Sequence, residues 1–288
     1  MTRLFNRPGP LAGAVRASIR LFSLSVMALA AVSLASAENN APTVLITGSN
    51  ASHGLAFAEE YAKLGWNVIA TCRSPAKAER LKALASKHAN IVIEKLDIVD
   101  DDEIEALAKK YDGTPIDVLL NNAAINVFRF GPNRFGKINY KWFEDILEVN
   151  IIGQLKVSEA FEDHVAASDQ KKIIAMTSTG GSIANVRSPV AVAYRSSKAG
   201  LNMAMRMYSI ALKRKAIIVG IIAPGTIDTE DYMNAKDPST VPGNYQAMMK
   251  AKMLAPRTAI NDMIALIDQL TLEETGVFYE WTGEVLPW

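Results

Sequence analysis

The 288-residue chain has few of the side chains that build disulfides and metal centres. Its single cysteine, Cys72, excludes a disulfide within the chain and a cysteine-rich metal site. Its three histidines, His53, His88 and His164, lie too far apart in sequence to match the spacing of metal ligands. We therefore expect no metal site.

The chain also lacks a large charge of either sign. Its formal net charge is +1, and 49% of its residues are hydrophobic. Residues 1–37 contain four arginines and no acidic residue, which leaves 27 basic and 30 acidic residues in the remainder. Nothing in this balance favours a nucleic acid or another polyanion as partner. The length and composition fit one large α/β domain.

Residues 1–37 have the character of a signal-like processing segment. The apolar run Leu21–Ala37 follows an arginine-bearing stretch and ends in Ala35-Ser36-Ala37, a small-x-small pattern. The run is at or just below the ~17–25 residues of a membrane span, so it predicts a secretory signal or a signal anchor rather than a stable span. An exported, periplasmic or membrane-anchored protein is the first interpretation. An organellar transit peptide, or a cytoplasmic protein that starts at Met27, is the alternative.

From Pro42 onward, short apolar runs alternate with segments of helical periodicity, which predicts a single Rossmann-type, doubly wound parallel sheet of about seven strands flanked by helices. Six runs rich in Val, Ile and Leu are predicted as buried strands: Thr43–Ile46, Asn67–Ala70, Ile91–Lys95, Ile116–Leu120, Lys172–Met176 and Ile217–Ile222. Helices are predicted near 54–64, 76–87, 101–110, 141–164 and 193–214.

The stretch after the sixth predicted strand has no strong periodicity. Pro224-Gly225 follow that strand, and the polar residues to about 257 contain several Met and Pro. Because ligands bind at the carboxyl ends of strands in such sheets, residues 226–257 are the predicted lid over the site of the domain 42–288.

The first predicted strand runs into a turn of small residues that opens the first helix. Such a turn allows backbone N–H groups and the helix N-terminus to approach a pyrophosphate. The alternative is an ordinary strand-to-helix turn. The residues of this turn that we predict to bind a dinucleotide are Gly48, Asn50, Ser52, His53 and Gly54.

Two further residues bear on which dinucleotide binds. Arg73 follows the second strand, where an acidic residue would bind the 2′-hydroxyl of NAD, so it favours the 2′-phosphate of NADP, with NAD as the alternative. A solvated surface arginine is the other interpretation. Asp97, after the third strand, is placed either to accept from an adenine amino group or to cap the helix that begins near Asp100.

Tyr194 and Lys198 are four residues apart on a predicted helix, so their side chains share one face. A phenol normally titrates near ~10, and a nearby ammonium lowers that pKa, which would make Tyr194 a general acid or base. Ser178 and Asn150 lie upstream as further candidates. In the alternative interpretation, Tyr194 and Lys198 are surface residues, Ser178 ends a strand, and Asn150 caps or kinks a helix.

The order of these motifs resembles the short-chain dehydrogenase/reductase family of the classical type, over residues 42–288. Thr47-Gly48-x3-Ser52-x-Gly54 is similar to its T-G-x3-G-x-G turn, with Ser52 in place of a glycine. Asn121–Ala124 is similar to its N-N-A-G element, and Tyr194-x-x-x-Lys198 to its signature. The chain resembles C-factor-like and sniffer-like carbonyl reductases more narrowly in Ala193–Arg195, Ala199–Met203 and Gly276–Trp288.

The resemblance implies an NADP(H)-dependent enzyme that moves a hydride between nicotinamide and a carbonyl or secondary alcohol. It implies that Tyr194 donates the proton, Ser178 binds the same oxygen, Lys198 binds the nicotinamide ribose and Asn150 holds a water that relays protons. Relatives of this type are commonly homodimers or homotetramers through their long helices, and the alternative is a monomer. The alternative is a nucleotide-binding signalling protein of the C-factor type without turnover. The cofactor site is implied to extend to Ile98, Asn122, Ala123, Pro224, Gly225, Thr226, Ile227 and Thr229.

Overall fold

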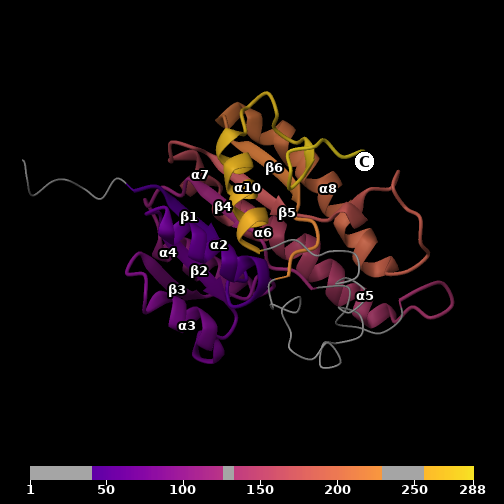
Figure 1. The fold of residues 1–288 in the computed structure, drawn as a ribbon, viewed down its shortest axis with the longest axis horizontal. Coiled ribbons are helices and arrows are strands. Elements are labelled where there is room, and N and C mark those ends of the chain that lie inside the picture. The colour runs from indigo at the N-terminus through magenta and orange to yellow at the C-terminus, as the bar shows by residue number, and fades with distance from the viewer. Residues whose placement is uncertain (1–40, 126–132, 229–255) are drawn as a thin grey trace, which may run out of the picture. The chain divides into compact units, whose positions relative to one another are not determined.

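The computed structural model describes residues 41–125, 133–228 and 256–288 (Figure 1). Pro42–Trp288 form one compact unit. The predicted processing segment 1–37 lies outside the described residues, as does most of the predicted lid. Among the helices that are described, none is long and apolar enough to cross a membrane.

The core of the unit is a seven-stranded sheet in which every neighbouring pair is parallel, in the order β3-β2-β1-β4-β5-β6-β7. This confirms the predicted doubly wound sheet. Six strands lie at or within two residues of the predicted runs, whereas the seventh has only three residues. The strands are β1 Thr43–Ile46, β2 Asn67–Cys72, β3 Ile91–Lys95, β4 Val118–Asn121, β5 Lys172–Met176, β6 Ile218–Ala223 and β7 Phe278–Glu280.

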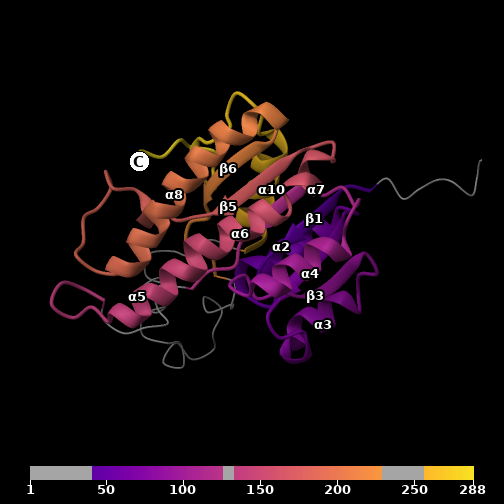
Figure 2. The ribbon, with the colours of Figure 1, turned by 180° about the vertical axis from the view of Figure 1, so that it is seen from behind.

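Helices cover both faces of the sheet (Figures 1 and 2). Because successive side chains of a strand point to opposite faces, Val44 and Ile46 of β1 enter one apolar cluster and Leu45 enters the other. The first cluster is completed by α2 Ser52–Lys63, α3 Glu79–Ala85 and α10 Pro256–Gln269. The second is completed by α4 Asp101–Lys110, α6 Gln154–Ala160, α7 Glu162–Ala166 and α8 Val192–Leu212.

The segment predicted as one helix at 141–164 is divided. It consists of α5 Tyr140–Leu147, the π-helical turn η3 Glu148–Gly153, α6 and α7. The wider π turn retains helical periodicity in the sequence, so the pattern did not mark the change. The part of the chain that the structure describes also contains the short helical turns η1 Pro75–Lys77, η4 Thr179–Gly181 and η5 Lys213–Lys215.

The strand order reverses between β1 and β4. From β1 the chain builds outward to β2 and β3, and from β4 it builds outward in the other direction. Neighbouring connections therefore leave opposite faces, and a crevice forms outside the carboxyl ends of these two strands. This topology places the predicted nucleotide turn, after β1, beside the Asn121–Ala124 element, after β4.

Candidate functional site

A cavity of about 330 Å³ lies at the carboxyl ends of the strands around this switch point. A larger cavity, of about 480 Å³, lies between α2 and α10 and contains none of the predicted site residues. The cavity at the strand ends contains most of them. Its walls include Gly48, Asn50, Ser52, His53, Arg73, Asp97, Ile98, Asn122, Ala123, Tyr194, Lys198 and Pro224.

The turn after β1 is bound to the end of β4. The Asn122 amide Nδ2 donates to the carbonyl oxygens of Thr47 at 2.9 Å and Gly48 at 3.2 Å. In return, the Thr47 hydroxyl oxygen accepts from the backbone N–H groups of Asn122 and Ala123. Gly54 packs directly on this turn, since a Cβ at that position would be only 2.3 Å from the Gly48 carbonyl oxygen. The turn is thus a closely packed cradle for which glycine at position 54 is required.

Ser52 begins α2 in the left-handed conformation, with φ of 52°. This conformation costs a residue with a Cβ about 1–2 kcal/mol. Ser52 therefore keeps the type of backbone geometry that glycine adopts readily, although it carries a side chain. Its neighbour His53 has a buried Nε2 atom with no hydrogen-bond partner among the described residues. Burial lowers the pKa of His53 to about 4, and the nearby Lys198 acts in the same direction.

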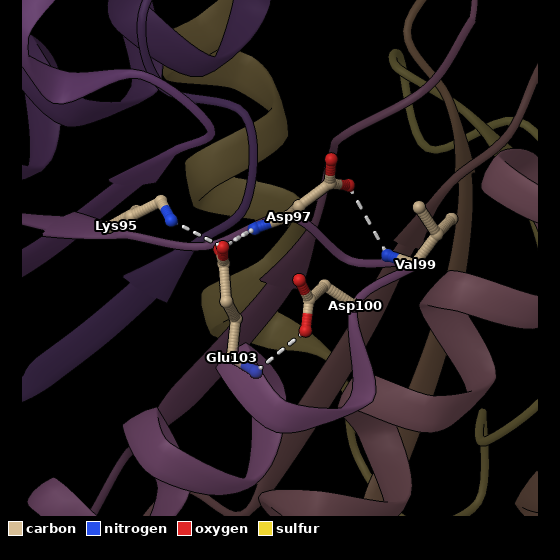
Figure 3. A network of polar contacts seen from close by, with 5 residues as sticks. All are labelled: Lys95, Asp97, Val99, Asp100 and Glu103. Carbon is tan, nitrogen blue, oxygen red and sulfur yellow. Dashed lines mark hydrogen bonds and ion pairs between the residues drawn. The ribbon is translucent and has the colours of Figure 1, made fainter.

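Figure 3 shows that Asp97 is not the cap of α4. Asp100 caps it, by accepting from the Glu103 backbone N–H, and the Glu103 carboxylate accepts in turn from the Asp97 backbone N–H. Lys95 pairs with Glu103 at 2.5 Å. The Asp97 carboxylate accepts only a 3.3 Å bond from the Val99 backbone N–H among these contacts. Of the two interpretations of Asp97, its position in the cavity wall favours the acceptor.

Tyr194 lies in the first turn of α8, and its hydroxyl bonds to Ser178, which follows β5. A hydrogen bond from Ser178 and the charge of Arg195 lower the pKa of Tyr194, but burial is the larger effect and the net pKa is raised. The sequence predicts a pKa lowered by Lys198, whereas burial of the phenol in the structure raises the pKa of Tyr194. The physical reason is that burial disfavours the phenolate more than its neighbours favour it.

Lys198 is almost fully buried, with 2% of its surface exposed. Its ammonium Nζ donates to the Met176 carbonyl oxygen at 2.8 Å and lies 6.0 Å from the centre of the Tyr194 ring. Burial lowers the pKa of Lys198 to about 7. At neutral pH this side chain is therefore poised between its charged and neutral forms.

Asn150 lies in the π turn η3 and is fully buried. Its Oδ1 accepts from the Ile125 backbone N–H at 2.7 Å, and its Nδ2 donates to the Ile125 carbonyl and to the Ser197 hydroxyl oxygen. The Ser197 hydroxyl in turn donates to the Tyr194 carbonyl oxygen at 2.7 Å. Asn150 is thus connected to α8 through Ser197, behind the cavity wall.

The other predicted residues are distributed as follows. Gly54 and Ser178 are not among the residues that line the cavity, although Ser178 hydrogen-bonds to Tyr194, which does line it. Gly225, Thr226 and Ile227, which follow β6, are not among the lining residues either. Thr229 lies outside the described residues. Sequence reasoning missed the Met176 carbonyl and Ser197, because a backbone acceptor leaves no side-chain signal and a serine inside a helix is common. No cluster of three or more metal-ligating side chains occurs in the described ranges.

A family model described as short chain dehydrogenase matches residues 42–239. The chain belongs to the short chain dehydrogenase family. It is accordingly an oxidoreductase of that family, with the parallel sheet and the order of motifs that the sequence resemblance implied.

Three relatives are informative. The NADPH-bound carbonyl reductase from chicken fatty liver is 29% identical, with a TM-score of 0.73 over 86% of this chain and 99% of that chain. The carbonyl reductase Sniffer of D. melanogaster is 25% identical, with a TM-score of 0.71 over 86% of this chain and 100% of that chain. C-signal of Myxococcus xanthus is 30% identical over 60% of this chain and 93% of its own length.

The buried Lys198 predicts a pH dependence of stability. The lysine pKa is near 10.5 in the unfolded chain and about 7 in the folded protein. Between these values the unfolded chain binds a proton that the folded protein releases, so the free energy of unfolding rises with pH, by at most ~1.4 kcal/mol per pH unit.

The variant Lys198→Met tests this, because methionine has a similar volume and no titrating group. Urea unfolding from pH 7 to pH 9 should show a steeper rise for the wild type than for Lys198→Met. Parallel pH profiles would contradict the lowered pKa of the buried Lys198 amine.

Proposed function

We propose that the protein is an NADP(H)-dependent oxidoreductase that transfers a hydride between the nicotinamide C4 and a carbonyl or secondary alcohol carbon. The observation that carries the proposal is one continuous cavity, whose wall runs from the glycine turn at Gly48 to Tyr194 and Lys198. A nucleotide cradle and a proton donor thus face the same space. The carbonyl reductases among the relatives support this reaction class.

The residues present fit a dinucleotide. Gly54 allows the start of α2 to pack against the Gly48 carbonyl, which keeps the turn in the cavity wall, and the buried Nε2 of His53 beside the turn has no hydrogen-bond partner among the described residues. Backbone N–H groups at the start of α2 would meet the pyrophosphate. The bound cofactor supplies the hydride, and the protein supplies orientation and proton transfer.

Tyr194 is the proposed proton donor in the reducing direction. Because burial raises its pKa, the hydroxyl is protonated at neutral pH, which is the form needed to donate to a developing alkoxide. Ser178, which bonds to Tyr194, would bind the same substrate oxygen and fix its position. In the oxidising direction Tyr194 must first lose its proton, so that direction should be favoured by higher pH.

Lys198 and Asn150 have supporting roles in the proposal. Lys198 would exchange its bond with the Met176 carbonyl for the nicotinamide ribose, and its ammonium form would stabilise the Tyr194 phenolate. Asn150 would hold a relay water near Lys198 while its side chain fixes Ile125 and Ser197.

Arg73 is the basis for proposing NADP rather than NAD. Its exposed side chain lies in the cavity wall immediately after β2, where it can pair with a 2′-phosphate. The NADPH in the chicken carbonyl reductase supports the same choice.

Association into a homodimer or homotetramer through the long helices is part of the proposal. Met203, Met207 and Ile210 lie on one face of α8 and are exposed by 62–68%. Exposed apolar side chains at helical spacing are typical of such an interface.

A second candidate is a nucleotide-binding signalling protein without turnover, which the similarity to C-signal supports over 60% of the chain. The presence of Ser178, Tyr194 and Lys198 together favours the enzyme. Steady-state NADPH oxidation with a panel of aldehydes and ketones separates the two. NADPH binding with no turnover of any carbonyl would support the signalling protein.

Tyr194→Phe should lower turnover by about 10²–10⁴-fold, because it removes the proposed proton donor. It should leave the Kd for NADPH nearly unchanged, because phenylalanine fills almost the same space. Both quantities are measured with the carbonyl that the wild type reduces fastest. Full activity of Tyr194→Phe would remove Tyr194 from the chemistry.

Arg73→Ala should weaken NADPH binding by roughly tenfold or more and leave NADH binding nearly unchanged, since one charge-assisted hydrogen bond contributes about 1.5–3 kcal/mol. Calorimetric titration with each nucleotide gives both dissociation constants. A wild type that binds NADH more tightly than NADPH would contradict the proposed phosphate contact.

A further inference from the structure

The helix that carries Tyr194 begins without a cap of its own. Ala191, the residue before α8, has φ of 60° and no side chain that can bond to the first turn. Left-handed backbone is uncommon in a residue with a Cβ and persists only where surrounding contacts enforce it. The backbone N–H groups in the first turn of α8 therefore need hydrogen-bond acceptors from another segment of the chain.

Asn133 provides this contact. Its backbone carbonyl oxygen accepts from the Val192 N–H at 3.1 Å, and its side-chain Oδ1 accepts from the Ala193 N–H at 3.0 Å. These are two of the N–H groups that no residue inside a helix can satisfy at its first turn. Asn133 thus caps the N-terminus of α8, although it lies 60 positions from Ala193 in the sequence.

The segments on either side of this contact are also joined. Arg134 forms an isolated antiparallel bridge with Val190, directly before the left-handed Ala191. Tyr194 is the third residue of α8, and Lys198 follows one turn later. The position of the Tyr194 hydroxyl relative to Ser178 consequently depends on Asn133 and Arg134, which precede α5.

We propose that Asn133 is a positioning residue of the reaction, which holds the first turn of α8 so that the Tyr194 hydroxyl meets Ser178 and the substrate oxygen. The inference rests on the proposed function. Asn133 contacts the backbone of Val192 and Ala193 and acts through Tyr194. Its Nδ2 is buried and has no partner among the described residues, so the oxygen is the atom that the helix uses.

Asn133→Ala removes the Oδ1 acceptor. The expected result is a fall in kcat of about 10–100-fold, because a displacement near 1 Å at the reacting group has a cost of that order. The KM for the carbonyl and the Kd for NADPH should stay within about twofold, since Gly48, Arg73 and Asn122 hold the nucleotide from other elements.

Asn139→Ala is the matched control. Asn139 caps α5 in the same way, with its Oδ1 accepting from the Trp142 N–H at 3.1 Å, and it lies outside the cavity wall. Both alanine variants should lower the melting temperature by about 2–4 °C. Only Asn133→Ala should lower kcat.

Two further substitutions test whether the Asn133 Oδ1 is the atom that holds the first turn of α8. Asn133→Asp keeps an oxygen acceptor beside a helix N-terminus, which favours a carboxylate, so it should retain most of the wild-type kcat. Asn133→Gln keeps the amide but moves it by one methylene, so it should lose kcat even if Asn133→Ala does not fold. Unchanged kcat in Asn133→Gln or Asn133→Ala, or equal loss in Asn139→Ala, would overturn the inference. A wild type that binds no NADPH would instead overturn the proposed function.

Discussion

The reciprocal bonds between Thr47 and Asn122 fix the geometry on which the site depends. They join the end of β1 to the end of β4, the two strands between which the sheet reverses its order. Because the Thr47 hydroxyl also binds the Ala123 N–H, the nucleotide turn and the chain that leaves β4 cannot move independently. Gly54 then packs within this junction at a distance that permits no side chain. The cavity is consequently a property of the sheet's topology and not of one loop.

The second feature of the site is the suppression of charge by burial. Lys198 and His53 are both shifted toward their neutral forms, and Tyr194 is shifted toward its protonated form. The cavity wall is therefore less charged at Lys198 and His53 than its composition suggests. An anionic ligand would reverse this, because negative charge raises the pKa of both the lysine and the histidine. Binding of the proposed cofactor and activation of the proposed proton donor would then be parts of one electrostatic event.

Much of the fold was predictable from local patterns, because buried parallel strands are apolar on both faces. The runs at Thr43–Ile46, Ile91–Lys95 and Lys172–Met176 agree with the strands at both ends. The three-residue β7 was not located, since so short a segment carries no periodicity and is formed by pairing with β6. The π turn at Asn150 was missed because its residues continue the helical pattern of their neighbours.

In the candidate site, the spacing of residues within one helix was predictable from the sequence, whereas contacts between distant segments were not. Tyr194 and Lys198 share a helical face, as their spacing predicts, but the pKa direction of Tyr194 was wrong because sequence shows neighbouring charges and not burial. The Met176 carbonyl and the contact of Asn133 with α8 join distant segments, so no local pattern could predict them.

The central claim of the proposal is that a bound NADP(H) would restore the charge that burial suppresses at Lys198. Calorimetric titration with NADPH at pH 8, in buffers of different ionisation enthalpy, measures it most directly by counting the protons exchanged. Lys198, with a pKa of about 7, is mostly neutral at that pH, so the account predicts net proton uptake that disappears in Lys198→Met. A binding enthalpy that is independent of the buffer would contradict it.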